Sequence, residues 1–275
     1  MTGICDGRIA IVTGAGRGLG ATYARLLAER GADVVVHDAG VEADGSGGDP
    51  GIARAVADEI GGVACVENLE TEDGCRRTVD FAVDRFGRLD AVIQNAGLNI
   101  WEELEDAHRS WERMRRVNVD APFHITRAAF AVMKGQGYGR FVFTTSGRAM
   151  AVERTRPGLA AYVVGKSAHF GLMIVTAAEG ESHGILANAV APAAATRMLV
   201  RSVEPGELEP EQVAPGVVFL ASSACTFTGR VLEAAGGEFG VARWTSSDEV
   251  DFGRDPVEPE VIAERWREIE GVVEA

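Results

Sequence analysis

The chain has 275 residues, 46% of them hydrophobic and 25% charged, which is enough for one large globular domain or two small ones. Its net charge of −14, with no basic cluster to offset it, would repel the phosphates of a nucleic acid and excludes that class of partner. No stretch approaches the roughly 18 apolar residues of a membrane helix and neither end resembles a targeting signal, so we expect a soluble, cytoplasmic protein with no membrane partner.

Short β-branched runs alternate with amphipathic segments along most of the chain. Seven runs predict strands, at residues 9–13, 33–37, 63–67, 91–94, 140–145, 186–190 and 231–235. Helical periodicity fills the gaps, at residues 19–30, 52–60, 72–86, 108–134, 160–182 and 210–221. This alternation predicts a single α/β domain, a Rossmann-type doubly wound sheet of seven parallel strands with helices on both faces. Ligands are expected at the carboxyl ends of its strands.

Two segments stand apart from this alternation. Residues 39–51 form an unusually long connection, rich in Gly and Asp, after the second predicted strand. Residues 1–240 are predicted to form the domain and residues 241–275 a C-terminal extension. In the extension Ile262, Trp266, Ile269 and Val273 recur at helical spacing. We expect a short helix there that docks on its own subunit or on a neighbouring one.

A glycine-rich turn, Thr13-Gly14-Ala15-Gly16-Arg17-Gly18-Leu19-Gly20, follows the first predicted strand and opens the first helix. Its glycines permit a tight turn whose backbone N–H groups meet a pyrophosphate at the positive end of a helix. Asp38 ends the second strand, 24 residues after Gly14, where a carboxylate accepts hydrogen bonds from ribose hydroxyls and repels a 2′-phosphate. NAD is therefore favoured over NADP, although Arg17 is a residue that can also meet a phosphate. The alternative for the glycine-rich turn is a simple entry into a helix, and the alternative for Asp38 is an ordinary turn residue at the end of a strand.

Tyr162 and Lys166 lie four residues apart in a predicted helix, and hence on one face of it. A free tyrosine has a pKa of about 10, so a tyrosine that serves as a base near neutrality needs a pKa lower by ~2 to 3. A nearby ammonium and the positive nicotinamide of NAD⁺ both favour the phenolate. Taken alone, the spacing is more typical of a surface pair on a helix.

In their order and separation, the glycine-rich turn and the Tyr162–Lys166 pair resemble the short-chain dehydrogenase/reductase family, over the chain to about Gly240. The resemblance implies catalysis by Asn118, Ser146, Tyr162 and Lys166, in which Ser146 polarises the substrate carbonyl and Asn118 holds a water of the proton relay. It also implies an NAD site made of Gly14, Arg17, Gly18, Leu19, Gly20, Asp38, Asn68, Leu69, Asn95, Ala96, Gly97, Tyr162, Lys166, Pro192 and Thr196.

Some positions depart from the family pattern. Gln94 replaces the first asparagine of an N-N-A-G element, Asn68 stands where an aspartate usually meets adenine, and Ala193 follows Pro192 in place of glycine. None touches the chemistry, so we expect altered cofactor affinity and a reshaped nicotinamide loop at most. Ser146 lies 16 residues before Tyr162, a few more than usual. The longer loop carries the arginines 148, 154 and 156 and is expected to border the substrate.

Within the family, residues 34–40, 191–198, 199–213 and 236–244 resemble the (3R)-hydroxyacyl-CoA dehydrogenase domain of the peroxisomal multifunctional enzymes of β-oxidation. We therefore predict an NAD-dependent oxidoreductase that interconverts a secondary alcohol and a ketone, with a 3-hydroxyacyl-CoA type thioester as substrate. The alternatives are a steroid or other secondary alcohol dehydrogenase and a 3-oxoacyl-thioester reductase. A different class is a non-catalytic NAD-binding sensor, which would be expected to lack Tyr162 or Lys166.

Partners other than the substrate follow from the same resemblance. Apolar faces on the helices predicted at residues 111–134 and 160–182 form subunit interfaces in this family, which implies a homodimer or homotetramer. The four cysteines, Cys5, Cys65, Cys75 and Cys225, have neither metal-binding nor disulfide spacing, so no metal is expected.

Overall fold

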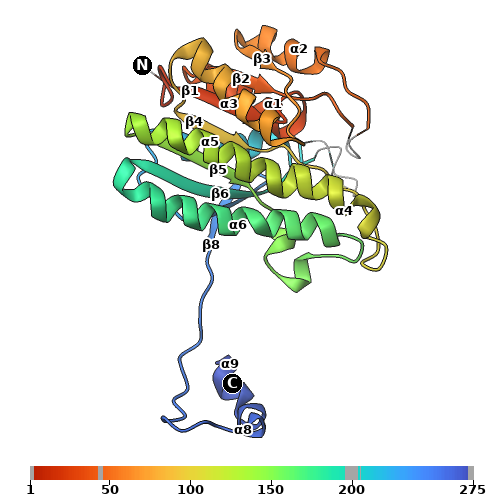
Figure 1. Ribbon diagram of the computed structural model, residues 1–275, viewed down its shortest axis with the longest axis vertical. Helices are drawn as coiled ribbons and strands as arrows, with labels where there is room; N and C mark the ends of the chain where they lie inside the picture. Colours follow the sequence, from red (N-terminus) through yellow and green to blue (C-terminus); the bar gives the residue numbers. More distant parts are fainter. Residues whose placement is uncertain (1–2, 43–45, 196–203, 205, 272–275) are drawn as a thin grey trace. The chain divides into compact units, whose positions relative to one another are not determined.

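The computed structural model describes residues 3–42, 46–195, 204 and 206–271. Its contacts divide the chain into two compact units, Met1–Ala242 and Arg243–Ala275. The first unit is built on one eight-stranded sheet of order β3-β2-β1-β4-β5-β6-β7-β8 (Figure 1). The strands are β1 Ile9–Thr13, β2 Asp33–His37, β3 Val63–Cys65, β4 Ala91–Gln94, β5 Gly139–Thr144, β6 Ile185–Ala193, β7 Val231–Ala235 and β8 Glu238–Ala242. The α-helices are α1 Gly18–Glu29, α2 Gly51–Ile60, α3 Glu72–Phe86, α4 His108–Arg115, α5 Ala121–Gln136, α6 Ala160–Gly180, α7 Ala214–Ala221, α8 Pro259–Glu264 and α9 Trp266–Glu270.

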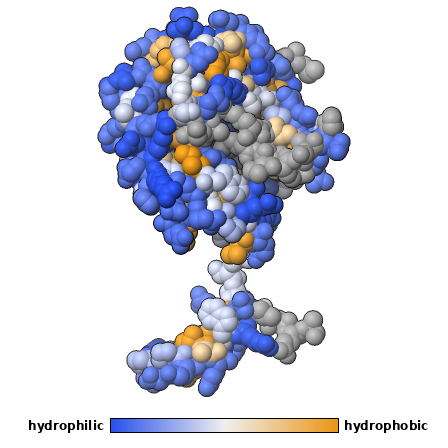
Figure 2. All heavy atoms as spheres, turned by 90° about the vertical axis from the view of Figure 1, so that its right-hand side faces the viewer, coloured by the Kyte–Doolittle hydropathy of each residue, from blue (hydrophilic) through white to orange (hydrophobic). Residues whose placement is uncertain are grey.

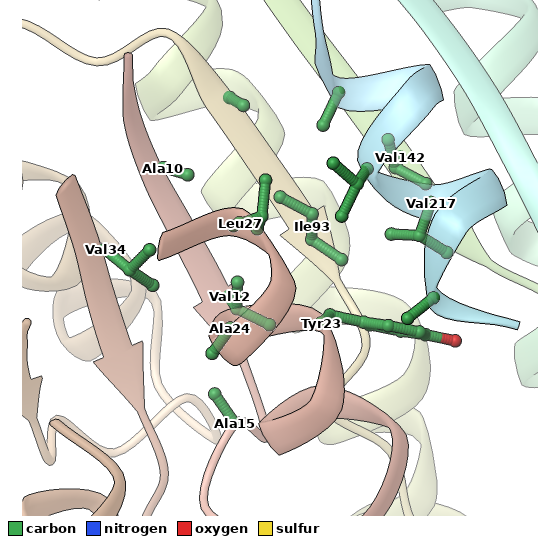
Figure 3. Close-up of a cluster of buried hydrophobic side chains, with 14 of the residues drawn as sticks. Ala10, Val12, Ala15, Tyr23, Ala24, Leu27, Val34, Ile93, Val142 and Val217 are labelled. Atoms are coloured by element: carbon green, nitrogen blue, oxygen red, sulfur yellow. The ribbon is translucent and has the colours of Figure 1, made fainter. Parts of the chain in front are cut away.

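The predicted doubly wound α/β architecture is confirmed. Strands β1 to β7 pair in parallel, and each central strand is a short apolar run because helices cover both faces of the sheet. One core cluster packs α1, α2 and α7 against one face, and Figure 3 shows Tyr23 and Leu27 of α1 beside Val217 of α7 in it. A second cluster packs α3, α5 and α6 against the other face.

The prediction of seven strands was one short, because β8 pairs antiparallel with β7 at the edge of the sheet. A two-residue turn joins them, and both turn residues, Gly236 and Gly237, have positive φ, +55° and +83°. Such a turn matches the twist of a hairpin and suits glycine. Most residues of β8 are exposed, so the strand lacks the buried apolar run by which the other seven were predicted.

The helix predicted over residues 108–134 is confirmed as one helical run, but it is not α-helical throughout. It is α4, a π-helical turn at Arg116–Asp120, and α5. Pro122 lies at the start of α5 and has no N–H to donate to the carbonyl of residue 118, four positions earlier, and its ring crowds that carbonyl. The wider turn is a physical consequence, and it falls on Asn118.

By length and composition alone, the segment Ala160–His183 is apolar enough to cross a membrane, with a mean hydropathy of 1.2. These values refer to an 18-residue window within the segment, and 44% of that window is buried in the structure. Helix α6, which makes up most of the segment, packs against β5 and β6. The core helix of a globular unit passes the same test.

The second unit contains α8 and α9 in place of the single helix expected there. Ser247 Oγ donates to the Ile269 carbonyl at 2.5 Å, and the Arg265 guanidinium lies 4.6 Å from the centre of the Phe252 ring. Trp266 is 54% exposed. Docking of this unit on another surface stays a prediction.

Candidate functional site

The glycine-rich turn between β1 and α1 is held in a conformation that only glycine fits at two points. Gly14 has φ +64°, and a Cβ at Gly20 would lie 2.1 Å from the Gly14 carbonyl oxygen. No side chain caps the N-terminus of α1, and its first turn has no acidic residue. The free N–H groups at this positive helix end therefore suit an anion such as a pyrophosphate.

The residues after β4 support this turn from the neighbouring strand. Asn95 Nδ2 donates to the carbonyls of Thr13 and Gly14 at 3.0 and 3.1 Å. The backbone N–H groups of Asn95 and Ala96 both donate to Thr13 Oγ1 at 3.0 Å. Gln94, which departs from the family pattern, is buried and donates to Thr126 of α5 at 2.7 Å. Its longer amide thus ties β4 to α5.

Asp38 is fixed where β2 ends. Its Oδ2 accepts from Gly16 N at 2.8 Å and its Oδ1 accepts from Gly40 N at 2.7 Å. Each carboxylate oxygen has a second lone pair that remains available to a hydroxyl group. Arg17, the residue able to meet a phosphate, forms an ion pair with Glu42 at 3.1 Å.

A cleft of about 550 Å³ opens beside these elements, within the range typical of small-molecule sites. Its lining includes eleven of the residues predicted to bind the cofactor, which are Gly14, Arg17, Gly18, Leu19, Gly20, Asp38, Asn68, Leu69, Asn95, Ala96 and Gly97. Pro192 is not part of this lining, and Thr196 lies outside the described residues. The glycine-rich turn, the uncapped helix end and the carboxylate in one cleft fit a dinucleotide.

The four predicted catalytic residues come from three elements. Tyr162 and Lys166 lie on α6, Asn118 on the π-helical turn, and Ser146 directly after β5. Lys166 is 3% exposed, and its Nζ donates to the Thr144 carbonyl at 2.8 Å and lies 6.0 Å from the centre of the Tyr162 ring. Ser146 Oγ accepts from Arg148 N at 3.2 Å. A Cβ on Gly97, which lines the cleft, would be 3.3 Å from both Lys166 Nζ and Asn118 Oδ1, so these two predicted catalytic residues lie beside the cleft, although none of the four is part of its lining.

Burial governs the ionisation of the catalytic groups. Desolvation raises the pKa of Tyr162, and the Ser146 hydroxyl and the Arg148 charge oppose that rise. Desolvation also lowers the pKa of Lys166 to about 8. The Ser146 hydroxyl and the Arg148 charge are thus the groups that lower the pKa of Tyr162 in the protein without cofactor, and the expected contribution of Lys166 stays a prediction.

Asn118 is held by hydrogen bonds of its side-chain amide and of its backbone carbonyl. Its side chain accepts from Leu98 N at 2.8 Å and donates to the Leu98 carbonyl at 2.9 Å. Its own backbone carbonyl, freed by Pro122, lies 3.1 Å from Nε2 of His169 on α6. Because a carbonyl only accepts, His169 Nε2 carries the hydrogen.

His169 is a buried residue that the sequence analysis missed. It is 1% exposed, and its Nδ1 has no partner among the described residues. Burial, followed by the Lys166 charge, lowers the pKa of His169 to about 3, so the ring is neutral. A histidine three residues after Lys166, on a buried helix face, was the available signal.

Gly165 explains how α6 approaches the π-helical turn so closely. A Cβ at Gly165 would lie 2.6 Å from the Asn118 Cβ, a separation that real Cβ atoms do not show.

Among the described residues, no group of three His, Cys, Asp or Glu side chains is placed to hold a metal ion.

Comparison with known proteins places this site in a family. A family model described as short chain dehydrogenase matches residues 8–207. The peroxisomal multifunctional enzyme type 2 of Mus musculus is 37% identical over 276 residues, covering 96% of this chain and 37% of the mouse protein. The chain therefore spans little more than a third of that relative.

Two solved structures from Mycobacterium avium share the fold. A short chain dehydrogenase has a TM-score of 0.84 and 33% identity, covering 98% of this chain and 96% of that one. Carveol dehydrogenase in complex with NAD has a TM-score of 0.75 and 25% identity, covering 84% and 97%. The resemblance predicted from the sequence, to the family and to the multifunctional enzymes, is confirmed.

Proposed function

The chain belongs to the short-chain dehydrogenase family, and from this premise we propose that it is an NAD-dependent oxidoreductase acting on a 3-hydroxyacyl-CoA type thioester. The single observation that carries the oxidoreductase assignment is the grouping of Tyr162 with Lys166 and the Ser146 hydroxyl, with Lys166 beside the cleft that the glycine-rich turn lines. Similarity to the multifunctional enzyme supports the thioester.

Asp38 and Glu42 support the choice of NAD. The Asp38 carboxylate lines the cleft, where it favours ribose hydroxyls and repels a phosphate. Glu42 pairs with Arg17, so the cation of the glycine-rich turn already has a carboxylate partner. When bound in this cleft, NAD⁺ would accept the hydride from the carbinol carbon.

The residues of the chain bind the alcohol and remove its proton. Ser146 donates a hydrogen bond to the substrate oxygen, and the Tyr162 phenolate takes the hydroxyl proton as the carbon–oxygen double bond forms. Lys166 holds the nicotinamide ribose and adds a positive charge beside the phenolate. The Asn118 carbonyl has a second lone pair beyond the one used by His169, which suits a water that passes the proton to solvent.

Three further assignments accompany the proposal. The first unit carries the site, and residues 241–275 are an extension that docks elsewhere. The protein works in the cytoplasm, as a homodimer or homotetramer.

The test is the absorbance of reduced nicotinamide during incubation with NAD⁺ or NADP⁺ and 3-hydroxyacyl-CoA thioesters, steroid alcohols or simple secondary alcohols. We expect rapid reduction of NAD⁺ with the thioesters. Tyr162→Phe should nearly abolish turnover and leave NAD binding intact. Turnover that survives this substitution refutes the catalytic assignment, and turnover of uncharged alcohols alone refutes the thioester.

A further inference from the structure

Arg148 is a half-buried cation beside the catalytic residues. It lies two positions after Ser146, and its backbone N–H donates to the Ser146 hydroxyl. Its guanidinium lies 6.0 Å from the centre of the Trp101 ring. Within the part of the chain that the structure describes, no carboxylate lies within ion-pair distance of it.

Arg154 provides the contrast. Its Nη1 lies 3.5 Å from where a Cβ on Gly147 would be, so it too borders the residue after Ser146. Arg154 is paired with Glu233 of β7, which neutralises its charge. Two guanidinium groups in this loop approach the site. Arg154 is already occupied by a carboxylate, whereas Arg148 has no carboxylate partner among the described residues and can offer its charge and its planar set of donors to a ligand.

The charge of Arg148 reaches the catalytic phenol. It is the one charged group that opposes the burial of Tyr162 and lowers the pKa of that residue. The other charged group that the described residues place against Tyr162 is Lys166, on the same helix. Arg148 therefore lies on the side of Tyr162 that belongs to the connection after β5.

The connections that carry Arg148 and Trp101 also carry exposed apolar side chains. Residues 98–107 and 147–159 follow β4 and β5 and meet where Glu102 N donates to the Gly158 carbonyl at 3.0 Å. They carry Trp101, Leu104 and Val152, which are 41%, 79% and 83% exposed. Figure 2, which faces the side where α4 lies in Figure 1, shows small hydrophobic patches set among hydrophilic residues. A guanidinium without a carboxylate partner beside an aromatic ring suits a molecule with a hydrocarbon chain and one strong acceptor.

We propose that the Arg148 guanidinium binds a second substrate oxygen, carried by the acyl carbon two positions from the carbinol carbon, so that the enzyme selects 3-hydroxyacyl compounds over plain secondary alcohols. The inference rests on the proposed dehydrogenase chemistry and deepens it. Ser146 and Tyr162 hold the hydroxyl, and the second oxygen, of a thioester or a carboxylate, meets the guanidinium of the residue two positions after Ser146. Lysine would supply the charge without the paired donors.

The experiment compares three six-carbon substrates, 3-hydroxyhexanoyl-CoA, 3-hydroxyhexanoate and hexan-2-ol, on the plateau of the pH profile. Arg148→Gln should lower kcat/KM for the substrates with the second oxygen by about 10- to 100-fold, the effect of one hydrogen bond to a charged group. The kcat/KM for hexan-2-ol should change less than about threefold. Arg76→Gln removes an exposed arginine of α3 that does not line the cleft and should change none of the three.

The outcomes separate this inference from the proposed function. If the wild type oxidises the free acid and not the thioester, the thioester proposal fails, and a selective loss in Arg148→Gln still upholds the role of Arg148. An equal loss on all three substrates, no loss, or turnover of hexan-2-ol alone overturns the role of Arg148.

A binding measurement tests the same role without turnover, because Trp101 lies against Arg148. The dissociation constant of 3-oxohexanoyl-CoA and of 3-oxohexanoate, followed by tryptophan fluorescence, should rise at least about tenfold in Arg148→Gln. An unchanged constant for both overturns the inference.

Discussion

Two glycines on α6 allow a prediction with opposite signs on one helix. At Gly171 an added Cβ meets nothing within 4 Å, so Gly171→Ala should stabilise the protein by about 0.5–1 kcal/mol through the lower conformational entropy of the unfolded chain. At Gly165 the added Cβ falls 2.6 Å from the Cβ of Asn118, an atom that no side-chain rotation can move. Helix α6 must then retreat from the π-helical turn by several tenths of an ångström.

The cost of such overpacking is about 1–3 kcal/mol, which exceeds the helix-propensity gain of about 1 kcal/mol. We therefore expect Gly165→Ala to be less stable than Gly171→Ala by about 1–3 kcal/mol, and to lose turnover because Tyr162 and Lys166 move with α6. Chemical denaturation at one protein concentration measures the first quantity, and nicotinamide absorbance the second. If Gly165→Ala stabilises as much as Gly171→Ala and keeps full activity, the close approach of α6 to Asn118 is wrong.

Three other predictions follow from the same site. His169 is neutral when folded, with a pKa of about 3, but takes a proton below about pH 6.5 when unfolded, so it stabilises the wild type above pH 6.5 and that contribution is lost as pH falls. Between pH 8 and pH 5 the unfolding free energy of the wild type should fall by about 2 kcal/mol more than that of His169→Leu. His108→Leu is the control for the loss of a histidine. An equal fall in the wild type and in His169→Leu would contradict this prediction. Asp38→Asn should shift the ratio of NAD to NADP affinity towards NADP by at least about tenfold, as followed by cofactor fluorescence, and an unchanged ratio would remove the argument for NAD. Gly20→Ala should keep its far-ultraviolet circular dichroism yet lose dinucleotide binding, because the new methyl group would lie 2.1 Å from the Gly14 carbonyl oxygen; intact binding would show that the turn plays no part in it.

The parallel part of the fold could be predicted because burial on both faces leaves a local trace. Each of the first seven strands is a short run of apolar residues bounded by turns, and β1 is buried along its whole length. Strand β8 leaves no such trace, since its residues are exposed and its pairing depends on the Gly236-Gly237 turn. That glycine pair was the available signal for a hairpin.

The site was predictable where motifs lie within a few residues of each other, and not where distant connections meet. The glycine-rich turn and the Tyr162–Lys166 spacing are local, and the structure gathers eleven predicted cofactor residues around one cleft. The contact of Arg148 with Trp101 joins the connections after β5 and β4, and no local pattern encodes it. The helix over residues 108–134 was predicted, but its π-helical turn was missed because apolar periodicity persists through it, although Pro122 marked the place.

The three residues that look least suited to their elements act on the same backbone atom or its neighbours. Pro122, near the start of a helix that the periodicity ran through, deprives the Asn118 carbonyl of its helical partner. His169, a polar residue on a buried helix face, donates to that carbonyl at 3.1 Å. Gly165, a helix-weakening residue, leaves room for Asn118 against α6. Each choice costs local stability, yet together they fix one carbonyl, which accepts from a neutral donor and keeps a second lone pair. Local rules fail together here because all three residues serve the close packing of Asn118 against α6, which outweighs the regularity of either helix.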